Sequence, residues 1–377
     1  MSTSNRWAWV EVDLDALRGN VAELLERAGK AELWATVKAN AYGHGAIEVA
    51  QVARAAGARG LCVALADEAH QLRLAEIDGP ILVVSEQPAT QHEQMLRDDL
   101  SATLYNESTI NDYAHTAARL GLIGRVHLKV DTGMHRVGVR VEDALARAQQ
   151  IRTSPSLHLE GVYTHFAAAD LPQHNETQKQ LIRFRDFVAT LVQHSLRPQY
   201  VHTANSSGAL RLLDPTTDIV RVGIAMYGIA PSNELETEMS AFKPVLSLHA
   251  RVSHVQHLAA GEGVSYGLRH KLDRASTIAT LPLGYGDGIP RRLWSTGGEV
   301  LIFGKRCPII GVVTMDQLMI NCGNVSVAIG DEAVLIGAQG NETITANQIA
   351  TKLDTIGYEI VCGLNMRLPR HNINTTN

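Results

Sequence analysis

The chain has 377 residues and a formal net charge of -5, with 45% hydrophobic and 19% charged residues. This composition is typical of a soluble globular protein of two to three domains, and it argues against a disordered chain, a coiled coil and a nucleic-acid-binding protein. The first residues lack the apolar segment of a secretory signal, and no window reaches the roughly 18 apolar residues that a membrane helix needs. We therefore expect a cytoplasmic protein that binds neither nucleic acid nor membrane.

The four cysteines, Cys62, Cys307, Cys322 and Cys362, are scattered along the chain and form no C-x-x-C pair. Such spacing argues against a zinc site and against a disulfide framework. We expect reduced thiols, most of them buried, and no metal centre.

Short apolar runs rich in β-branched residues alternate with segments of helical periodicity between residues 33 and 228. This alternation predicts a parallel sheet covered by helices. The predicted strands are 33–38, 61–65, 80–85, 102–105, 126–130, 159–165, 200–203 and 219–223. Eight strand–helix units in about 200 residues fit a (β/α)8 TIM barrel better than a doubly wound sheet.

The pattern changes after about residue 240. Apolar runs at 245–255, 277–283, 300–302, 309–313, 318–321 and 333–336 are separated by glycine-rich turns, and only 346–353 has helical periodicity. The sequence thus predicts an N-terminal barrel domain over 1–240 and a C-terminal, mostly β domain over 241–377. The alternating segment 7–12 could pair with the β domain, and the polar tail after Arg370 is expected to fray.

Candidate site residues are the polar residues that end the barrel strands, because barrel enzymes build their active sites there. Lys38 ends the first strand and precedes a turn in which Gly43 and Gly45 allow the backbone to pass close to a ligand. Desolvation disfavours a cationic amine, which suits a lysine that bonds to a carbonyl cofactor. A surface lysine at a strand end is the alternative.

Three further strand ends carry polar groups. His165 ends the sixth strand and is either a catalytic residue or a hydrogen-bonded core histidine. Ser206 follows the seventh strand, and Arg221 precedes Gly223 at the end of the eighth, where barrels commonly hold a phosphate. Because the sequence has neither a G-x-G-x-x-G nor a Walker motif, a compact phosphorylated cofactor is favoured over a nucleotide.

Lys129 lies within the fifth predicted strand, and alternation places it on the same face as His127 and Asp131. It is therefore directed into the barrel. An inward cation without a partner is costly, so we expect an ion pair with Asp131 or another carboxylate.

Several motifs occur in one order along nearly the whole chain: VKANAYGHG at 37–45, KVDTGMHR at 129–136, YTHF at 163–166, ANS at 204–206, RVGI at 221–224, GVSYG at 263–267, MDQ at 315–317 and YEI at 358–360. Together they closely resemble the alanine racemases that depend on pyridoxal 5'-phosphate (PLP). The resemblance implies a barrel with a β domain, PLP as cofactor, alanine as substrate, and a homodimer with shared active sites.

The resemblance also implies two proton-transfer bases. Lys38 resembles the lysine that bonds to PLP and acts as one base, and Tyr266 of the partner subunit resembles the other. Racemisation removes a proton from one face of the α-carbon and returns one to the opposite face, so the two bases must lie on opposite sides of the cofactor.

Further residues resemble groups that hold the cofactor and substrate. Arg221 resembles the arginine that contacts the pyridine nitrogen. A guanidinium keeps its protons, so Arg221 would donate a hydrogen bond without protonating the ring nitrogen. The ring is then a weaker electron sink, which favours racemisation over amino transfer. Arg136 and Met315 resemble substrate-carboxylate contacts. Lys129 resembles a lysine that is carbamylated in many members, and Tyr285 and Asp316 resemble residues of the substrate corridor. The implied cofactor contacts are Lys38, Tyr42, His165, Ser206, Arg221, Gly223, Ile224 and Tyr358.

The predicted function is PLP-dependent interconversion of L-alanine and D-alanine, which would supply D-alanine for peptidoglycan. A serine or broad small-amino-acid racemase is the alternative, because Gly286, His135 and Thr314 depart from the usual family pattern. A PLP-dependent decarboxylase fits the motif at 263–267 and Arg221 poorly. A non-catalytic PLP carrier is disfavoured because such carriers resemble a barrel alone.

Overall fold

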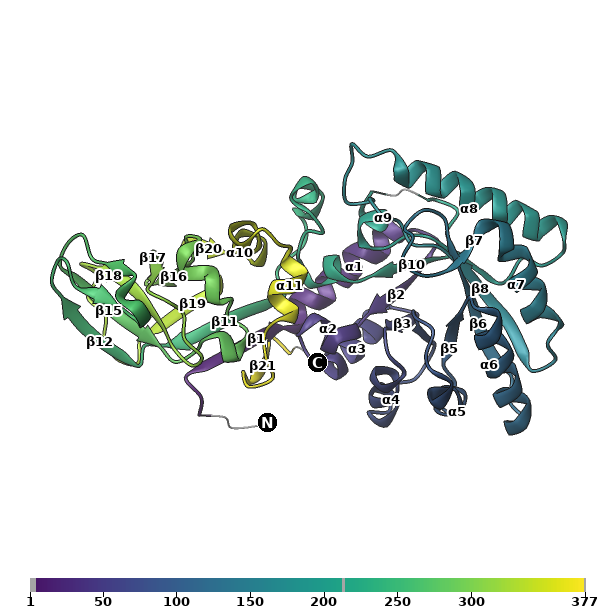
Figure 1. The fold of residues 1–377 in the computed structure, drawn as a ribbon, viewed down its shortest axis with the longest axis horizontal. Coiled ribbons are helices and arrows are strands. Elements are labelled where there is room, and N and C mark those ends of the chain that lie inside the picture. Colours follow the sequence, from purple (N-terminus) through teal and green to yellow (C-terminus); the bar gives the residue numbers. More distant parts are fainter. Residues whose placement is uncertain (1–4, 212–213, 376–377) are drawn as a thin grey trace.

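The computed structural model describes residues 5–211 and 214–375 of the chain (Figure 1). A barrel of parallel strands forms one end of the molecule and a strand-rich part forms the other. Within the described residues, no helix combines the length and apolar character needed to cross a bilayer. Cys62, Cys307 and Cys322 are buried, Cys362 is exposed, and all four thiols are free.

The barrel is built from eight parallel strands, which confirms all eight strands expected from the sequence and the TIM-barrel fold. Their spatial order is β10-β2-β3-β4-β5-β6-β8-β9. Backbone hydrogen bonds of 2.8–2.9 Å join the two outer strands, from Asp218 N–H to the Val201 carbonyl and from Arg221 N–H to the Ala204 carbonyl, so the barrel is nearly closed. The strands are β2 (Glu32–Thr36), β3 (Gly60–Val63), β4 (Ile81–Val83), β5 (Ser101–Leu104), β6 (Gly124–Asp131), β8 (Leu157–Tyr163), β9 (Tyr200–His202) and β10 (Ile219–Val222), and the short β7 (Val139–Arg140) pairs with β6.

Helices cover the outside of the barrel (Figure 1). The first helix shows why they form: Asp13 caps its N-terminus by accepting the Ala16 N–H at 2.8 Å, and Leu17, Val21 and Leu24 form a buried apolar stripe at helical spacing. These helices are α1 (Leu14–Ala28), α3 (Ala46–Ala55), α4 (Ala66–Leu74), α5 (Ala89–Arg97), α6 (Glu107–Leu120), α7 (Val141–Thr153) and α8 (Glu176–Gln193). The short segments α2 (Lys38–Tyr42) and α9 (Ser206–Leu210) follow β2 and β9 at the C-terminal ends of the strands.

The strand-rich part confirms the mostly β architecture expected after residue 240. Its large sheet has the order β12-β15-β18-β17-β16-β19-β11-β1-β21, with β20 paired to β19. The strands are β11 (Leu246–Arg251), β12 (His254–Leu258), β15 (Ser276–Leu281), β16 (Glu299–Ile302), β17 (Lys305–Ile310), β18 (Leu318–Gly323), β19 (Glu332–Gln339) and β20 (Glu342–Ile344), and β13 (Gly263–Val264) pairs with β14 (His270–Lys271).

The two ends of the described chain lie side by side in this sheet. Strand β1 (Ala8–Asp13) pairs antiparallel with β11 and parallel with β21 (Arg370–Ile373). The expectation that the tail frays after Arg370 is therefore wrong up to residue 373. The tail pairs through its backbone, so its polar side chains do not reveal the strand.

Short helices were largely missed. Helix α10 (Ala346–Leu353) matches the predicted 346–353, but α11 (Gly357–Cys362) was not predicted because six residues are too few to show helical periodicity. The single-turn 3₁₀ helices are η1 (Ile224–Tyr227), η2 (Asn233–Leu235), η3 (Thr237–Met239), η4 (Tyr266–Leu268), η5 (Tyr285–Asp287) and η6 (Arg291–Ser295).

Candidate active site

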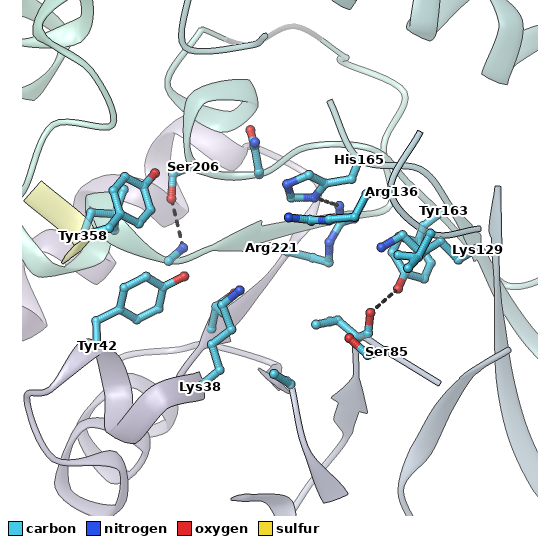
Figure 2. A pocket seen from close by; sticks show the side chains of 17 residues that line it. Lys38, Tyr42, Ser85, Lys129, Arg136, Tyr163, His165, Ser206, Arg221 and Tyr358 are labelled. Carbon is cyan, nitrogen blue, oxygen red and sulfur yellow. Dashed lines mark hydrogen bonds between the residues drawn. The ribbon is translucent and has the colours of Figure 1, made fainter. Parts of the chain in front are cut away.

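A cavity of about 410 Å³ opens at the C-terminal ends of the barrel strands (Figure 2). This volume lies within the range of ordinary small-molecule sites. Ten of the residues singled out from the sequence line it: Lys38, Tyr42, Lys129, Arg136, His165, Ser206, Arg221, Gly223, Ile224 and Tyr358.

Lys38 enters the cavity from an unusual turn that directly follows β2. Residues 39–42 all have φ between 52° and 54°, so the backbone makes a left-handed turn without a glycine. Each such residue costs about 1–2 kcal/mol, and outside contacts must offset that cost. Glu68 accepts the N–H of residue 39 at 2.6 Å, and the Asn40 side chain accepts the N–H of residue 46 at 2.9 Å. The turn places Tyr42 beside Lys38 at the cavity (Figure 2).

Three hydroxyl groups gather at one end of the cavity, those of Tyr42, Ser206 and Tyr358 (Figure 2). Ser206 Oγ accepts the backbone N–H of Gly223 at 2.9 Å, which ties the start of α9 to the end of β10. A Cβ atom at Gly223 would collide with the Tyr42 hydroxyl, so a glycine is needed for this close approach. Tyr358 comes from α11, which explains why its position could not be argued from the strand pattern.

The other end of the cavity is cationic. Lys129, Arg136 and Arg221 line it, Lys38 lies between the two ends, and no acidic side chain is among the lining residues (Figure 2). Burial and the neighbouring cations, Arg221 first, lower the pKa of Lys129 to about 8. A cavity with this charge is suited to an anionic ligand.

The ion pair expected between Lys129 and Asp131 is not formed. The Asp131 carboxylate instead accepts three backbone N–H groups at 3.0 Å, those of Gly133, Met134 and His135. It thereby shapes the loop that leads to Arg136. Lys129 lies over the Tyr163 ring, with Nζ 5.5 Å from the ring centroid.

Arg221 and His165 lie next to each other. Arg221 Nη2 donates to the Thr164 carbonyl at 2.9 Å, to the Thr203 carbonyl at 3.2 Å and to His165 Nδ1 at 3.4 Å. Burial, reinforced by Arg221, lowers the pKa of His165 well below its usual value. His165 is therefore a neutral imidazole whose Nδ1 carries no proton.

Four predicted site residues lie elsewhere. Tyr266, Tyr285, Met315 and Asp316 border an open hollow of about 530 Å³ on the strand-rich part, together with Arg291, Val313, Thr314 and Gln317. Tyr266 is 72% exposed and Met315 is 53% exposed. A single chain thus separates the predicted residues into a barrel group of ten and a group of four outside it.

Sequence reasoning missed several residues of both groups. Arg367 donates to Asp316 Oδ1 at 2.7 Å, and a Cβ atom at Gly286 would collide with the Arg367 guanidinium. An alanine at position 286 would therefore displace the Arg367 side chain from its present position. In the barrel, the lining residues not proposed from the sequence are Thr36, Ala64, Val84, Ser85, Val137, Tyr163 and Asn205. Thr36 and Tyr163 end strands and Ala64 and Val84 directly follow strands, which was the available signal.

Comparison with known proteins identifies the family. A model of the alanine racemase N-terminal domain matches residues 12–231, and a model of the alanine racemase C-terminal domain matches residues 245–372. The chain belongs to the alanine racemase family. An alanine racemase of Symbiobacterium thermophilum is 43% identical over 366 residues, which cover 97% of each chain. One of Listeria monocytogenes is 41% identical over 370 residues, which cover 97% of this chain and 98% of that one.

Solved structures agree with this membership. The alanine racemase of a D-cycloserine-producing Streptomyces lavendulae superposes with a TM-score of 0.95 at 35% identity, over 99% of this chain and 98% of that one. The alanine racemase of Bacillus anthracis, solved with bound L-Ala-P, gives a TM-score of 0.94 at 39% identity, over 100% of this chain and 97% of that one.

Proposed function

We propose that this chain interconverts L-alanine and D-alanine, with PLP held in the barrel cavity. The observation that carries the proposal is the arrangement around Lys38: its amine lies between a cluster of hydroxyl groups and a cluster of cations (Figure 2). The reaction class, amino-acid racemisation, is that of the family to which the chain belongs.

The charge and the polar lining of the cavity fit PLP, and its volume is that of a small-molecule site. The phosphate would lie at the hydroxyl end, where the hydroxyls of Tyr42, Ser206 and Tyr358 converge and Gly223 leaves space that a Cβ atom would fill. The ring would then extend toward Arg221, whose guanidinium would donate to the pyridine nitrogen. Four lining cations and no lining carboxylate suit a phosphate together with an amino-acid carboxylate.

Bound PLP would withdraw electrons from the α-carbon of alanine and so ease loss of its proton. Lys38 would hold the cofactor and carry the proton to and from one face. Arg136 would bind the substrate carboxylate, aided by the backbone N–H of Met315 from the partner subunit. Tyr266 of the partner subunit would carry the proton at the opposite face, as a two-base racemase requires.

The proposed active site needs two copies of the chain. Tyr266, Tyr285, Met315 and Asp316 border an exposed hollow that is separate from the barrel cavity. A homodimer in which the hollow of one subunit covers the cavity of the other would complete each site. Burial in such an interface would also explain the exposure of Tyr266 and Met315 in the single chain.

We also propose a carbamate on Lys129, a cytoplasmic location and a role in supplying D-alanine for peptidoglycan. The carbamate would convert a cation among cations into an anion that holds Arg136. A serine or broad small-amino-acid racemase is the second candidate, because Arg367 holds Asp316, which borders the hollow, and Gly286 follows Tyr285 there, so both could change which side chains pass. A hydrophobic wall rejects one additional group by only about 1–3 kcal/mol.

One experiment tests both the reaction and its substrate. The purified protein with PLP is given L-alanine, L-serine and L-lysine separately, and circular dichroism follows loss of optical activity. We expect rapid racemisation of alanine, slower racemisation of serine and none of lysine. Borohydride should fix the cofactor onto Lys38; a peptide map with the label on another residue would overturn the proposed site.

A further inference from the structure

A chain of buried polar side chains runs from the cavity into the interior of the barrel. Arg221 Nη1 lies 2.6 Å from His202 Nδ1, and His202 Nε2 lies 2.8 Å from His127 Nδ1. His127 Nε2 in turn lies 3.1 Å from Glu160 Oε2. Each of the four residues is at most 9% exposed, and they come from β10, β9, β6 and β8.

Arg221 is a buried cation whose direct acceptors are all neutral. Besides His202, it donates to two backbone carbonyls and to His165. Removing an uncompensated charge from water costs several kcal/mol, so a buried guanidinium needs a counter-charge. Glu160 lies at the far end of the imidazole chain and is the carboxylate to which that chain connects Arg221 through Oε2. Its other oxygen, Oε1, lies 3.9 Å from Arg125 Nε.

The geometry permits only one arrangement of protons. A guanidinium can only donate, so His202 Nδ1 accepts and the His202 proton must be on Nε2. That proton points at His127 Nδ1, which must accept, so the His127 proton is also on Nε2. It is donated to the carboxylate of Glu160. Every hydrogen bond therefore points the same way, from Arg221 to Glu160.

We propose that Glu160, acting through His127 and His202, fixes Arg221 as a hydrogen-bond donor facing the cavity. Glu160 and His127 are then positioning residues for the reaction, because they reach the cofactor site only through Arg221. The consequence for catalysis rests on the proposed function; the proton arrangement does not.

Neighbouring residues pack closely against the imidazole rings of His127 and His202. A Cβ atom at Gly161 would collide with the His127 ring, so β8 carries a glycine opposite it. The Tyr163 ring stacks on His202 at 4.7 Å between centroids and 8° between planes. Ser101 donates to the same Glu160 oxygen that His127 contacts, at 2.5 Å. These contacts restrain the two rings, whose planes lie at 68° to each other.

The ionisation of the groups agrees with this arrangement. Burial lowers the pKa of both histidines, that of His202 well below its usual value, so both rings are neutral at pH 7. Burial alone would raise the pKa of Glu160, but hydrogen bonds from His127 and Ser101, together with the nearby Arg125 guanidinium, outweigh it and lower that pKa to about 2.

Neutron diffraction from a crystal of the deuterated protein with PLP tests the proton arrangement directly. We expect deuterium on Nε2 and none on Nδ1 in both His202 and His127. Deuterium on Nδ1 of either ring would overturn the proposed hydrogen-bond chain from Arg221 to Glu160. Because this measurement needs no turnover, it stays valid whichever amino acid the enzyme racemises.

Substitutions at Glu160 test whether the charge matters. Glu160→Gln keeps the size and an acceptor oxygen but removes the charge, whereas Glu160→Asp keeps the charge. We expect Glu160→Gln to lower kcat about tenfold, a change of about 1.4 kcal/mol in the activation free energy, with little change in KM. We expect amino transfer to become more frequent per racemisation, because a less fixed Arg221 allows the ring nitrogen to gain a proton. Glu160→Asp should restore most of kcat and of the product ratio.

Glu332→Gln is the matched control, because Glu332 accepts from His249 at 2.9 Å in the same kind of pair outside the barrel. It should leave kcat and the product ratio unchanged. A merely structural role for Glu160 predicts a lowered Tm in both Glu160 variants with an unchanged product ratio, and that result would overturn the proposal. Complete inactivity of the unmodified enzyme with correctly placed deuterium would instead count against the proposed function alone.

Discussion

The charges around Lys129 determine whether its amine can react. It is 6% exposed, lies near three other cations and has no carboxylate within ion-pairing distance among the described residues. Burial and these cations lower its pKa from 10.5 to about 8. Only a neutral amine reacts with carbon dioxide. Near pH 8 a large fraction of Lys129 is therefore neutral, whereas an exposed lysine, with a pKa of about 10.4, is almost entirely protonated there.

We predict a carbamate on Lys129 that depends on pH. In protein supplied with ¹³C-bicarbonate, a carbamate carbon signal should appear as the pH rises through about 8 and should be lost as the pH falls to 6, because the protonated amine does not react. NMR of the protein without substitutions and of the Lys129→Arg variant checks this prediction. An equal signal in both proteins, or none at pH 9, would contradict it.

Gly223 tests the proposed phosphate end. We predict that Gly223→Ala lowers PLP affinity more than tenfold and stability by about 1–3 kcal/mol, because the new methyl carbon would collide with the Tyr42 hydroxyl oxygen and force it to move. Fluorescence titration with PLP and urea unfolding measure the two effects. Gly19→Ala in α1 is the control: a Cβ there meets no atom within 4 Å, and alanine favours a helix. Unchanged PLP binding in Gly223→Ala would place the phosphate elsewhere.

The turn at residues 39–42 depends on an element far away in the sequence. Arg370, the first residue of β21, donates to the carbonyl of Gly43 at 3.1 Å and also to the carbonyls of Leu364, Asn365 and Leu368 at 2.8 Å. The C-terminal strand thus holds the loop that presents Lys38 and Tyr42. The same contacts explain why the tail is ordered.

We predict that Arg370→Met lowers the free energy of unfolding by about 1–3 kcal/mol, because three part-buried carbonyls and one exposed carbonyl lose their donor. It should also weaken PLP binding, since the turn beside Lys38 loses a contact. Urea unfolding and PLP titration check both effects. Arg251→Met removes one exposed bond to a carbonyl and a cation–π contact with Trp9, so it should cost at most about 1 kcal/mol and leave PLP binding unchanged. Equal behaviour of the two variants would show that Arg370 does not support the turn.

The elements that were predicted are long or apolar, whereas those that were missed are short and depend on contacts with distant parts of the chain. The barrel strands are apolar runs buried on both faces, which is a strong signal in a single sequence. Strand β21 and helix α11 are short and depend on partners distant in the chain, so their sequences carry little signal. The left-handed turn was equally invisible, because Ala-Asn-Ala-Tyr contains no glycine to indicate positive φ.

The site shows the same division. Lys38, His165 and Arg221 could be proposed from their positions at strand ends, and the structure places all three at one cavity. Tyr358 and Tyr266 were proposed only from the family resemblance, since neither ends a barrel strand. The counter-charge for Arg221 could not be found from sequence, because Glu160 and His127 come together only when β6 and β8 pair in the barrel.

The whole molecule is arranged so that its two parts hold different pieces of the proposed site. We propose a barrel domain over 1–240 and a β domain over 241–377, with β1 belonging structurally to the sheet of the second. The cavity lies on the barrel and the hollow with Tyr266 on the β part. Each complete site would thus combine the barrel of one subunit with the hollow of its partner.

Mixing two inactive variants tests this composite site. Lys38→Ala and Tyr266→Ala homodimers should each be nearly inactive, because every site in them lacks one base. When the two are unfolded together and refolded, about half of the dimers contain one chain of each kind, and each of these has one site with both bases. We predict recovery of about a quarter of the unmodified activity. Mixed dimers that form, as shown by differently tagged chains, but remain as inactive as their parents would contradict a site shared between subunits.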